Sequence, residues 1–166
     1  FEQFDCVPDI LVMGKGMASG LPIGAFTASR AHMDTLQDPK LGHITTFGGN
    51  PVIAAGALAT LKVLQQTNII ADTLKKESLI RSLLVHPAIS EIRGRGLMLA
   101  LIMESAEMAD YLVLEAQKEG LLLFWLLFEP RAVRISPPLT ISEVELKQGC
   151  SLILRLLQRH DNIGVN

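Results

Sequence analysis

The sequence predicts a mixed α/β fold in two parts. The first part contains a short, wholly apolar strand, ILVM, followed by a glycine-rich loop. A helix at about residues 51–66 then follows, and it has no polar face over its first three turns. From residue 89 onward the hydrophobic pattern gives the order strand, strand, helix, strand, strand, helix, which is typical of a compact α+β domain. We therefore expect a boundary near residues 66–72.

Charge and composition argue against several classes of partner. The 166 residues carry a formal charge of −2 with acids and bases mixed along the chain, so neither a nucleic-acid surface nor a polybasic membrane surface is expected. The longest apolar run, LLLFWLLF, is too short for a membrane helix, which needs about 20 residues. Cys6 and Cys150 have no metal-ligand spacing. We expect free thiols in a reducing, cytoplasmic compartment and no metal site.

The first part is expected to form one strand and two helices. The run at 10–13 is typical of a parallel strand that is buried on both faces. Ser29 is expected to cap a short helix. Asn50 and Pro51 fit the cap and the first position of a helix that runs to about Gln66. Because this helix is apolar all round, we expect it to be covered all round.

The second part is expected to alternate strands and helices. Ser142 and Glu145 match the capping box that opens a helix. The apolar run that contains Trp125 is interpreted as a buried core strand. The elements predicted from the hydrophobic pattern are a helix at 71–86, strands at 89–94 and 96–103, a helix at 106–119, strands at 121–127 and 132–136, and a helix from 142 to about 158.

Lys15 stands between two glycines, directly after the apolar strand. A phosphate-binding loop is excluded because Asp9 occupies the position of its first glycine, and a dinucleotide fingerprint is excluded because Ser19 occupies the position of its third. Two interpretations remain from the residues alone. Lys15 is either a solvated lysine in a tight turn, or an amine that forms a Schiff base and is favoured by partial burial at the strand end.

Four segments in order resemble a known family. The segment PDILVMGKGMASGLPIGAF at 8–26 resembles the lysine segment of the class III pyridoxal-phosphate-dependent aminotransferases, which include acetylornithine, ornithine and 4-aminobutyrate aminotransferases. The segments HITTFGGNP, IRGRGLMLA and VRISPPLTIS agree with later motifs of the same family. The resemblance implies the pyridoxal-phosphate-dependent transferase fold type I. Residues 1–70 would end its large, mostly parallel-sheet domain, and residues 71–166 would form its small carboxy-terminal α+β domain.

The resemblance also implies roles for four residues. Lys15 would hold pyridoxal 5'-phosphate as an internal aldimine and move a proton during the reaction. Thr46, with Thr45 beside it, would bind the cofactor phosphate of the neighbouring subunit, which implies a homodimer. Arg134 would pair with a substrate carboxylate.

Each of these positions also has a plainer interpretation from the residues alone. Thr45 and Thr46 could be ordinary strand threonines before a turn. Arg134 could be an arginine on the wet face of an edge strand, paired with Glu129 or with nothing. The arginine motif around Arg93 is interpreted as a structural turn between two strands.

The implied reaction moves an amino group from an ω-amino substrate, such as acetylornithine, ornithine or 4-aminobutyrate, to a 2-oxo acid. Alternatives are an aminomutase or decarboxylase on the same scaffold, or a non-catalytic folded fragment that serves as an interaction domain. The family's aspartate for the pyridine nitrogen and its glycine-rich phosphate loop are not found in this sequence. We therefore expect the chain to be the carboxy-terminal portion of an aminotransferase and to be inactive alone.

Overall fold

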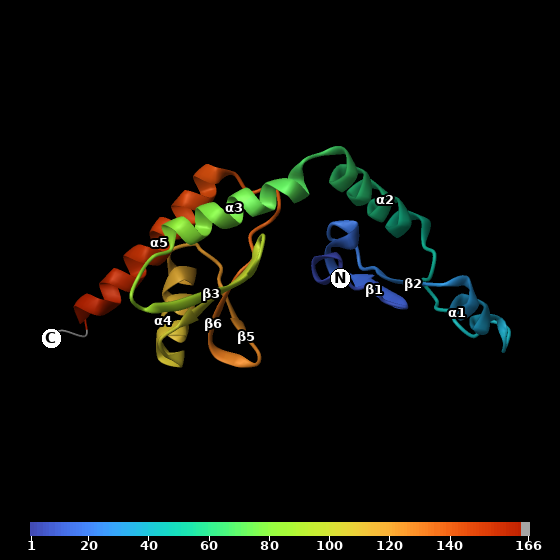
Figure 1. Ribbon diagram of the computed structural model, residues 1–166, viewed down its shortest axis with the longest axis horizontal. Helices are drawn as coiled ribbons and strands as arrows, with labels where there is room; N and C mark the ends of the chain where they lie inside the picture. The colour runs from blue at the N-terminus through green and yellow to red at the C-terminus, as the bar shows by residue number, and fades with distance from the viewer. Residues whose placement is uncertain (164–166) are drawn as a thin grey trace. The chain divides into compact units, whose positions relative to one another are not determined.

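The structure, a computed structural model, describes residues 1–163 and divides into two compact units that meet in sequence between Thr67 and Asn68 (Figure 1). Both units mix helices and strands, which confirms the predicted α/β class. Within the described residues, no helix is both long and apolar enough to cross a membrane.

The first unit contains a two-stranded sheet and one long helix. Asn50 caps that helix, since its Oδ1 accepts bonds from the amides of Val52 (3.0 Å) and Ile53 (3.3 Å). Ser29 caps the short helix as predicted, and its Oγ accepts from the His32 amide. The elements are 3-10 turn η1 (Glu2–Phe4), β1 (Ile10–Gly14), 3-10 turn η2 (Lys15–Ala18), β2 (Gly24–Ala28), α1 (Arg30–Asp34), 3-10 turn η3 (Thr35–Gln37) and α2 (Pro51–Gln66).

The predicted burial of this unit is wrong for this chain. Strand β1 pairs antiparallel with β2, not in a parallel sheet, and Ile10 and Val12 are 53% and 76% exposed. Helix α2 is likewise exposed along most of its length and buries Ala57. The physical reason is that two strands and one helix cannot cover both faces of a strand. The apolar pattern correctly located the elements, but the residues that would cover them are not among residues 1–67.

The second unit is a four-stranded antiparallel sheet with three helices (Figure 1). The strand order in the sheet is β3-β4-β6-β5. The predicted order from residue 89 is confirmed. Helix α3 ends at Leu83, before the predicted end, because Pro87 disfavours helix in the residue ahead of it. The elements are α3 (Ile69–Leu83), β3 (Ile89–Arg95), β4 (Met98–Met103), α4 (Ala106–Lys118), β5 (Phe124–Leu126), β6 (Glu129–Ile135) and α5 (Glu143–Ile163).

One face of this sheet and the three helices form the hydrophobic core. The predicted capping box opens α5: the Ser142 amide donates to Glu145 Oε2 (2.8 Å), and the Glu145 amide donates to Ser142 Oγ (3.2 Å). Leu146, Cys150, Ile153 and Leu157 recur at helical spacing along α5 and are buried. Core residues come from α3, β4, α4, β6 and α5 in turn, for example Ile80, Leu101, Leu112, Val133 and Leu157.

The hairpin between β3 and β4 is pinned to helix α3, which supports its interpretation as a structural turn. Gly94 has φ 105°, and a Cβ added there would lie 2.1 Å from the carbonyl oxygen of Met98. Arg81 donates to the carbonyl oxygens of Ile92 (2.6 Å) and Gly94 (3.0 Å). Glu77 accepts from Arg81 Nε at 2.9 Å and from the Gly96 amide. Burial raises the pKa of Glu77. The hydrogen bonds from Gly96 and Arg81 together lower it by more than burial raises it, so the pKa of Glu77 lies below its ordinary value.

The predicted core strand at 121–127 is wrong in extent and in burial. Only Phe124–Leu126 forms a strand, at the edge of the sheet. Trp125 is 42% exposed, and its Nε1 donates to Asp110 Oδ1 at 2.7 Å. Leu127 and Phe128 form the hairpin tip and are almost fully exposed. An apolar run by itself therefore did not distinguish an edge strand from a buried one.

Candidate active site

Lys15 begins the turn η2 in a left-handed backbone conformation. Its φ is 51°, and Gly14 before it is extended. For a residue with a side chain this conformation costs about 1–2 kcal/mol and is found mainly where function or surrounding structure requires it. A Cβ added at Gly16 or Gly20 would meet no atom within 4 Å, so the backbone beside the lysine is open. The side chain of Lys15 is exposed, and the predicted burial at the strand end is not found.

Thr45 and Thr46 are exposed in the turns that lead into helix α2. The amide of Gly48 donates to the carbonyl oxygen of Thr45 at 3.2 Å, and a Cβ on Gly48 would lie 2.6 Å from Thr45 Oγ1. The Asn50 side chain already binds two amides at the start of α2. An anion at this end of the helix would therefore depend on the threonine hydroxyls and the turn amides.

Arg134 lies on strand β6 between two buried residues, Val133 and Ile135. Its side chain is on the exposed face of the sheet, opposite to those of its two neighbours. The neighbouring Arg131 takes Glu129 as its partner (Nε to Oε1, 3.2 Å), so the alternative that pairs Glu129 with Arg134 is wrong. The expected edge position is wrong as well, since β6 lies between β4 and β5 in the sheet. The guanidinium carbon of Arg134 lies 5.1 Å from the centre of the Phe124 ring.

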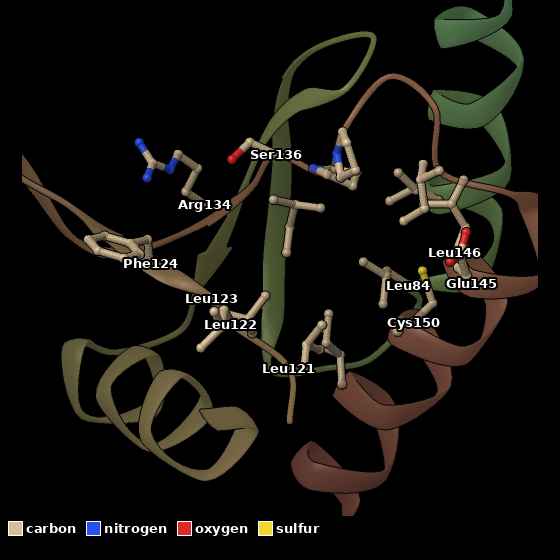
Figure 2. Close-up of a pocket in the computed structure, with 17 residues that line it drawn as sticks. Leu84, Leu121, Leu122, Leu123, Phe124, Arg134, Ser136, Glu145, Leu146 and Cys150 are labelled. Carbon is tan, nitrogen blue, oxygen red and sulfur yellow. The ribbon is translucent and has the colours of Figure 1, made fainter. Parts of the chain in front are cut away.

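A cavity of about 300 Å³ lies next to Arg134 within the second unit. Figure 2 shows Arg134 and Phe124 at one end of this cavity and Glu145 and Cys150 at the other. Most of the lining is apolar, and burial raises the pKa of the Cys150 thiol to about 11. The nitrogen atoms of Arg134 are directed away from the interior of the cavity. The guanidinium is therefore available to an anion outside the apolar pocket.

The four predicted site residues are divided between the two units. Lys15, Thr45 and Thr46 belong to the first unit, and Arg134 belongs to the second. Sequence reasoning missed Phe124, which was assigned to the core. No local signal could have found it, because a two-residue turn at 127–128 alone would place Phe124 opposite Arg131. The register shift between Trp125 and Leu126 pairs it with Arg134 instead. Within residues 1–163, no group of His, Cys, Asp and Glu side chains could hold a metal ion.

Solved structures of aminotransferases match this fold closely. An acetylornithine aminotransferase from Elizabethkingia anophelis matches with a TM-score of 0.84 and 30% identity, over 95% of this chain and 43% of that one. An ornithine aminotransferase from Toxoplasma gondii, described with partial occupancy of pyridoxal phosphate at its active site, matches with a TM-score of 0.87 and 28% identity, over 99% and 40% of the two chains. These likenesses confirm the predicted fold class.

Curated relatives point to the same family. The acetylornithine aminotransferase of Mycobacterium leprae is 38% identical over 153 residues, which cover 87% of this chain and 36% of that protein. The enzyme of the same name from Haemophilus ducreyi is 35% identical over 158 residues, 95% of this chain and 39% of that protein. The chain thus spans less than half the length of these relatives. The family model for Aminotransferase class-III matches residues 1–157. The chain therefore belongs to the class III aminotransferases, a pyridoxal-phosphate-dependent family.

Proposed function

We propose that this chain carries the cofactor lysine and a substrate-binding arginine of an aminotransferase that moves an amino group from an ω-amino substrate to a 2-oxo acid. The observation that carries the proposal is Lys15, held at φ 51° between two glycines at the end of β1. Strained backbone conformations of this kind cluster at functional sites, which supports a role for this amine. The acetylornithine and ornithine aminotransferases among the matched proteins support an ω-amino donor.

The residues of the first unit fit pyridoxal phosphate in kind. Lys15 supplies the primary amine that an aldehyde requires, and the open backbone at Gly16 and Gly20 leaves room for a flat ring beside it. The hydroxyls of Thr45 and Thr46 are suitable donors to a phosphate. When bound, the cofactor acts as an electron sink for the substrate carbanion. Lys15 would tether the cofactor and, once released, accept at its Nζ the proton from the substrate carbon that bears the transferred amino group.

Arg134 is proposed to bind a substrate carboxylate. Its guanidinium fork is exposed and is not paired with Glu129, so it is free to make the two parallel bonds that a carboxylate accepts. The stacking on Phe124 restricts the orientation of the fork. Both features support a role in fixing the plane of a substrate.

Three further proposals concern organisation. Residues 1–70 would be the end of the large cofactor-binding domain and residues 71–166 the small domain, and the two compact units support a boundary near that point. The active unit would be a homodimer in which Thr46 binds the phosphate of the partner's cofactor. The exposure of Thr46 supports this arrangement. The two free cysteines support a cytoplasmic location.

The test is a transamination assay on the full-length protein with acetylornithine, ornithine or 4-aminobutyrate as donor and 2-oxoglutarate as acceptor. Glutamate formation should be lost in Lys15→Ala. Lys62→Ala is the matched control, since Lys62 is an exposed lysine of α2 with no assigned role. Equal activity of Lys15→Ala and Lys62→Ala would contradict the proposed function.

A further inference from the structure

The turn that carries Lys15 packs against helix α2 through small residues. Ala18 of the turn and Ala57 of the helix are 3% and 6% exposed, and they are the buried hydrophobic residues of the first unit. Gly56 lies at the same contact, and a Cβ added there would be 2.8 Å from Leu21 Cδ1 and 3.6 Å from the carbonyl oxygen of Ala18. A side chain at Gly56 would therefore displace the end of the Leu21 side chain, whereas the Ala18 backbone lies at an ordinary contact distance.

A pair of hydroxyls joins the two elements beside this contact. Thr60 Oγ1 of α2 lies 3.0 Å from Ser19 Oγ and 3.0 Å from the carbonyl oxygen of Gly56. A hydroxyl can donate one bond and accept others. Because the Thr60 hydroxyl has one hydrogen, it donates to Ser19 or to Gly56, and both bonds form together when Ser19 donates to Thr60.

The turn needs such support because both of its ends are in unfavourable conformations. Lys15 has φ 51° and Ser19 has φ 46°, and they flank the turn from opposite sides. Left-handed conformations of residues with side chains persist where neighbouring structure holds them. The Ser19 amide donates to the carbonyl oxygen of Gly16 at 3.1 Å, so the end tied to α2 is also bonded to the residue after the lysine.

We propose that Ser19 and Thr60 are positioning residues for Lys15. Their hydroxyl pair ties the turn to helix α2 and thereby fixes the backbone from which the Lys15 amine projects. The inference rests on the proposed function of Lys15 as the cofactor-bearing amine. It assigns no contact with substrate or cofactor to Ser19 or Thr60.

The variant that tests the tie is Thr60→Val, which keeps the size and branching of the side chain and removes the hydroxyl. The matched control is Thr67→Val. The Thr67 hydroxyl donates to the carbonyl oxygen of Val63 (2.7 Å), the same four-residue bond that Thr60 makes with Gly56, but it does not contact the turn. Ser19→Ala removes the other hydroxyl, and Thr60→Ser restores the hydroxyl at residue 60.

Two measurements on the full-length protein give the readout. The first is the acylation rate of the Lys15 amine in cofactor-free protein, followed against pH by mass spectrometry with Lys62 as the internal standard. In Thr60→Val and Ser19→Ala the ratio of the Lys15 rate to the Lys62 rate should change by about twofold or more from its wild-type value, because the turn is no longer held. The second is transamination, in which kcat should fall about two- to tenfold, as expected for one net hydrogen bond, while KM for the 2-oxo acid is unchanged.

The remaining variants complete the test. The double variant should lose little more than either single variant, since the two hydroxyls act as one pair. Thr60→Ser should recover the wild-type values, and Thr67→Val should keep them. If the wild-type protein forms its cofactor adduct at Lys15 and Thr60→Val behaves like Thr67→Val, this inference alone is overturned. If no adduct forms at Lys15, the proposed function and this inference fail together.

Discussion

Arg134 and Phe124 lie directly opposite each other on strands β6 and β5, and the guanidinium carbon of Arg134 is 5.1 Å from the ring centre of Phe124. A guanidinium over an aromatic face at an exposed site is stabilised by about 0.5–1 kcal/mol. The ring also limits the directions in which the fork can point. Phe124 is thus placed to orient the group that we propose to bind a substrate carboxylate.

Replacing Phe124 by leucine should therefore weaken carboxylate binding without affecting the chemistry. In Phe124→Leu we expect KM for carboxylate-bearing substrates to rise about two- to fivefold, the equivalent of the lost stacking, with kcat unchanged. Phe128→Leu is the control, because Phe128 is 97% exposed at the tip of the same hairpin. Steady-state kinetics on the full-length protein measure both variants, and equal effects would contradict an orienting role for Phe124.

Arg134 itself should be sensitive even to lysine. Removal of the guanidinium in Arg134→Ala should cost about 2–5 kcal/mol in kcat/KM for a substrate whose carboxylate it binds. Arg134→Lys should recover only part of this, since an ammonium cannot make two parallel bonds. Arg131→Lys, in the arginine already paired with Glu129, should change kcat/KM little. If simple amines without a carboxylate lose as much activity as carboxylate substrates, Arg134 has a structural role instead.

The proposed homodimer can be tested by subunit complementation. Lys15→Ala and Thr46→Ala proteins should each be inactive or nearly so. In a mixed dimer, one site would combine the intact Lys15 of one subunit with the intact Thr46 of the other, so mixing should restore up to half of the wild-type activity per dimer. Subunit exchange is verified with two affinity tags. Verified exchange without recovered activity would show that Thr46 does not serve the partner's cofactor.

The stability of the second unit should depend on Glu77 in acid. Because the native pKa of Glu77 is lowered, its contribution is present above its ordinary pKa of 4.5 and is lost as the pH falls through the native value. Glu77→Gln should lower the free energy of unfolding near neutral pH by about 1–3 kcal/mol and weaken its acid dependence. Urea unfolding of this chain, followed by the fluorescence of its single tryptophan, measures both effects.

The control for Glu77 is Glu91, which forms an exposed ion pair with Arg93 on strand β3 of the same β3–β4 hairpin. Glu91→Gln should change the free energy of unfolding by less than about 1 kcal/mol, because surface ion pairs contribute little. Equal losses in the two variants would contradict the account of Glu77 as the residue that pins the hairpin to α3.

The sequence predicted most elements because their signals are local. Asn50 with Pro51, and Ser142 with Glu145, identify helix starts whose hydrogen bonds form within three residues. Burial was predicted less well, since it depends on what packs against an element. The strand at 10–13 and the run around Trp125 are both apolar, and both contain exposed side chains. Their exposure could not be predicted from the local sequence pattern.

The candidate site was predicted in part for the same reason. Lys15 and Arg134 were found through motifs that are continuous in sequence. Phe124, Ser19 and Thr60 were not, because their partners are ten or more residues away and become neighbours only through the hairpin or the packing of α2. The left-handed conformation of Lys15 could not be expected from its residue type, since lysine rarely adopts it.

Locating the attached cofactor tests whether Lys15 is the cofactor-bearing amine. The full-length protein is loaded with pyridoxal phosphate, reduced with borohydride, digested and analysed by mass spectrometry. A pyridoxyl group should be found on the peptide that contains Lys15 in the wild-type protein, and none should be found in Lys15→Ala. A pyridoxyl group on Lys40 or Lys62 in the wild-type protein, with Lys15 unmodified, would contradict it.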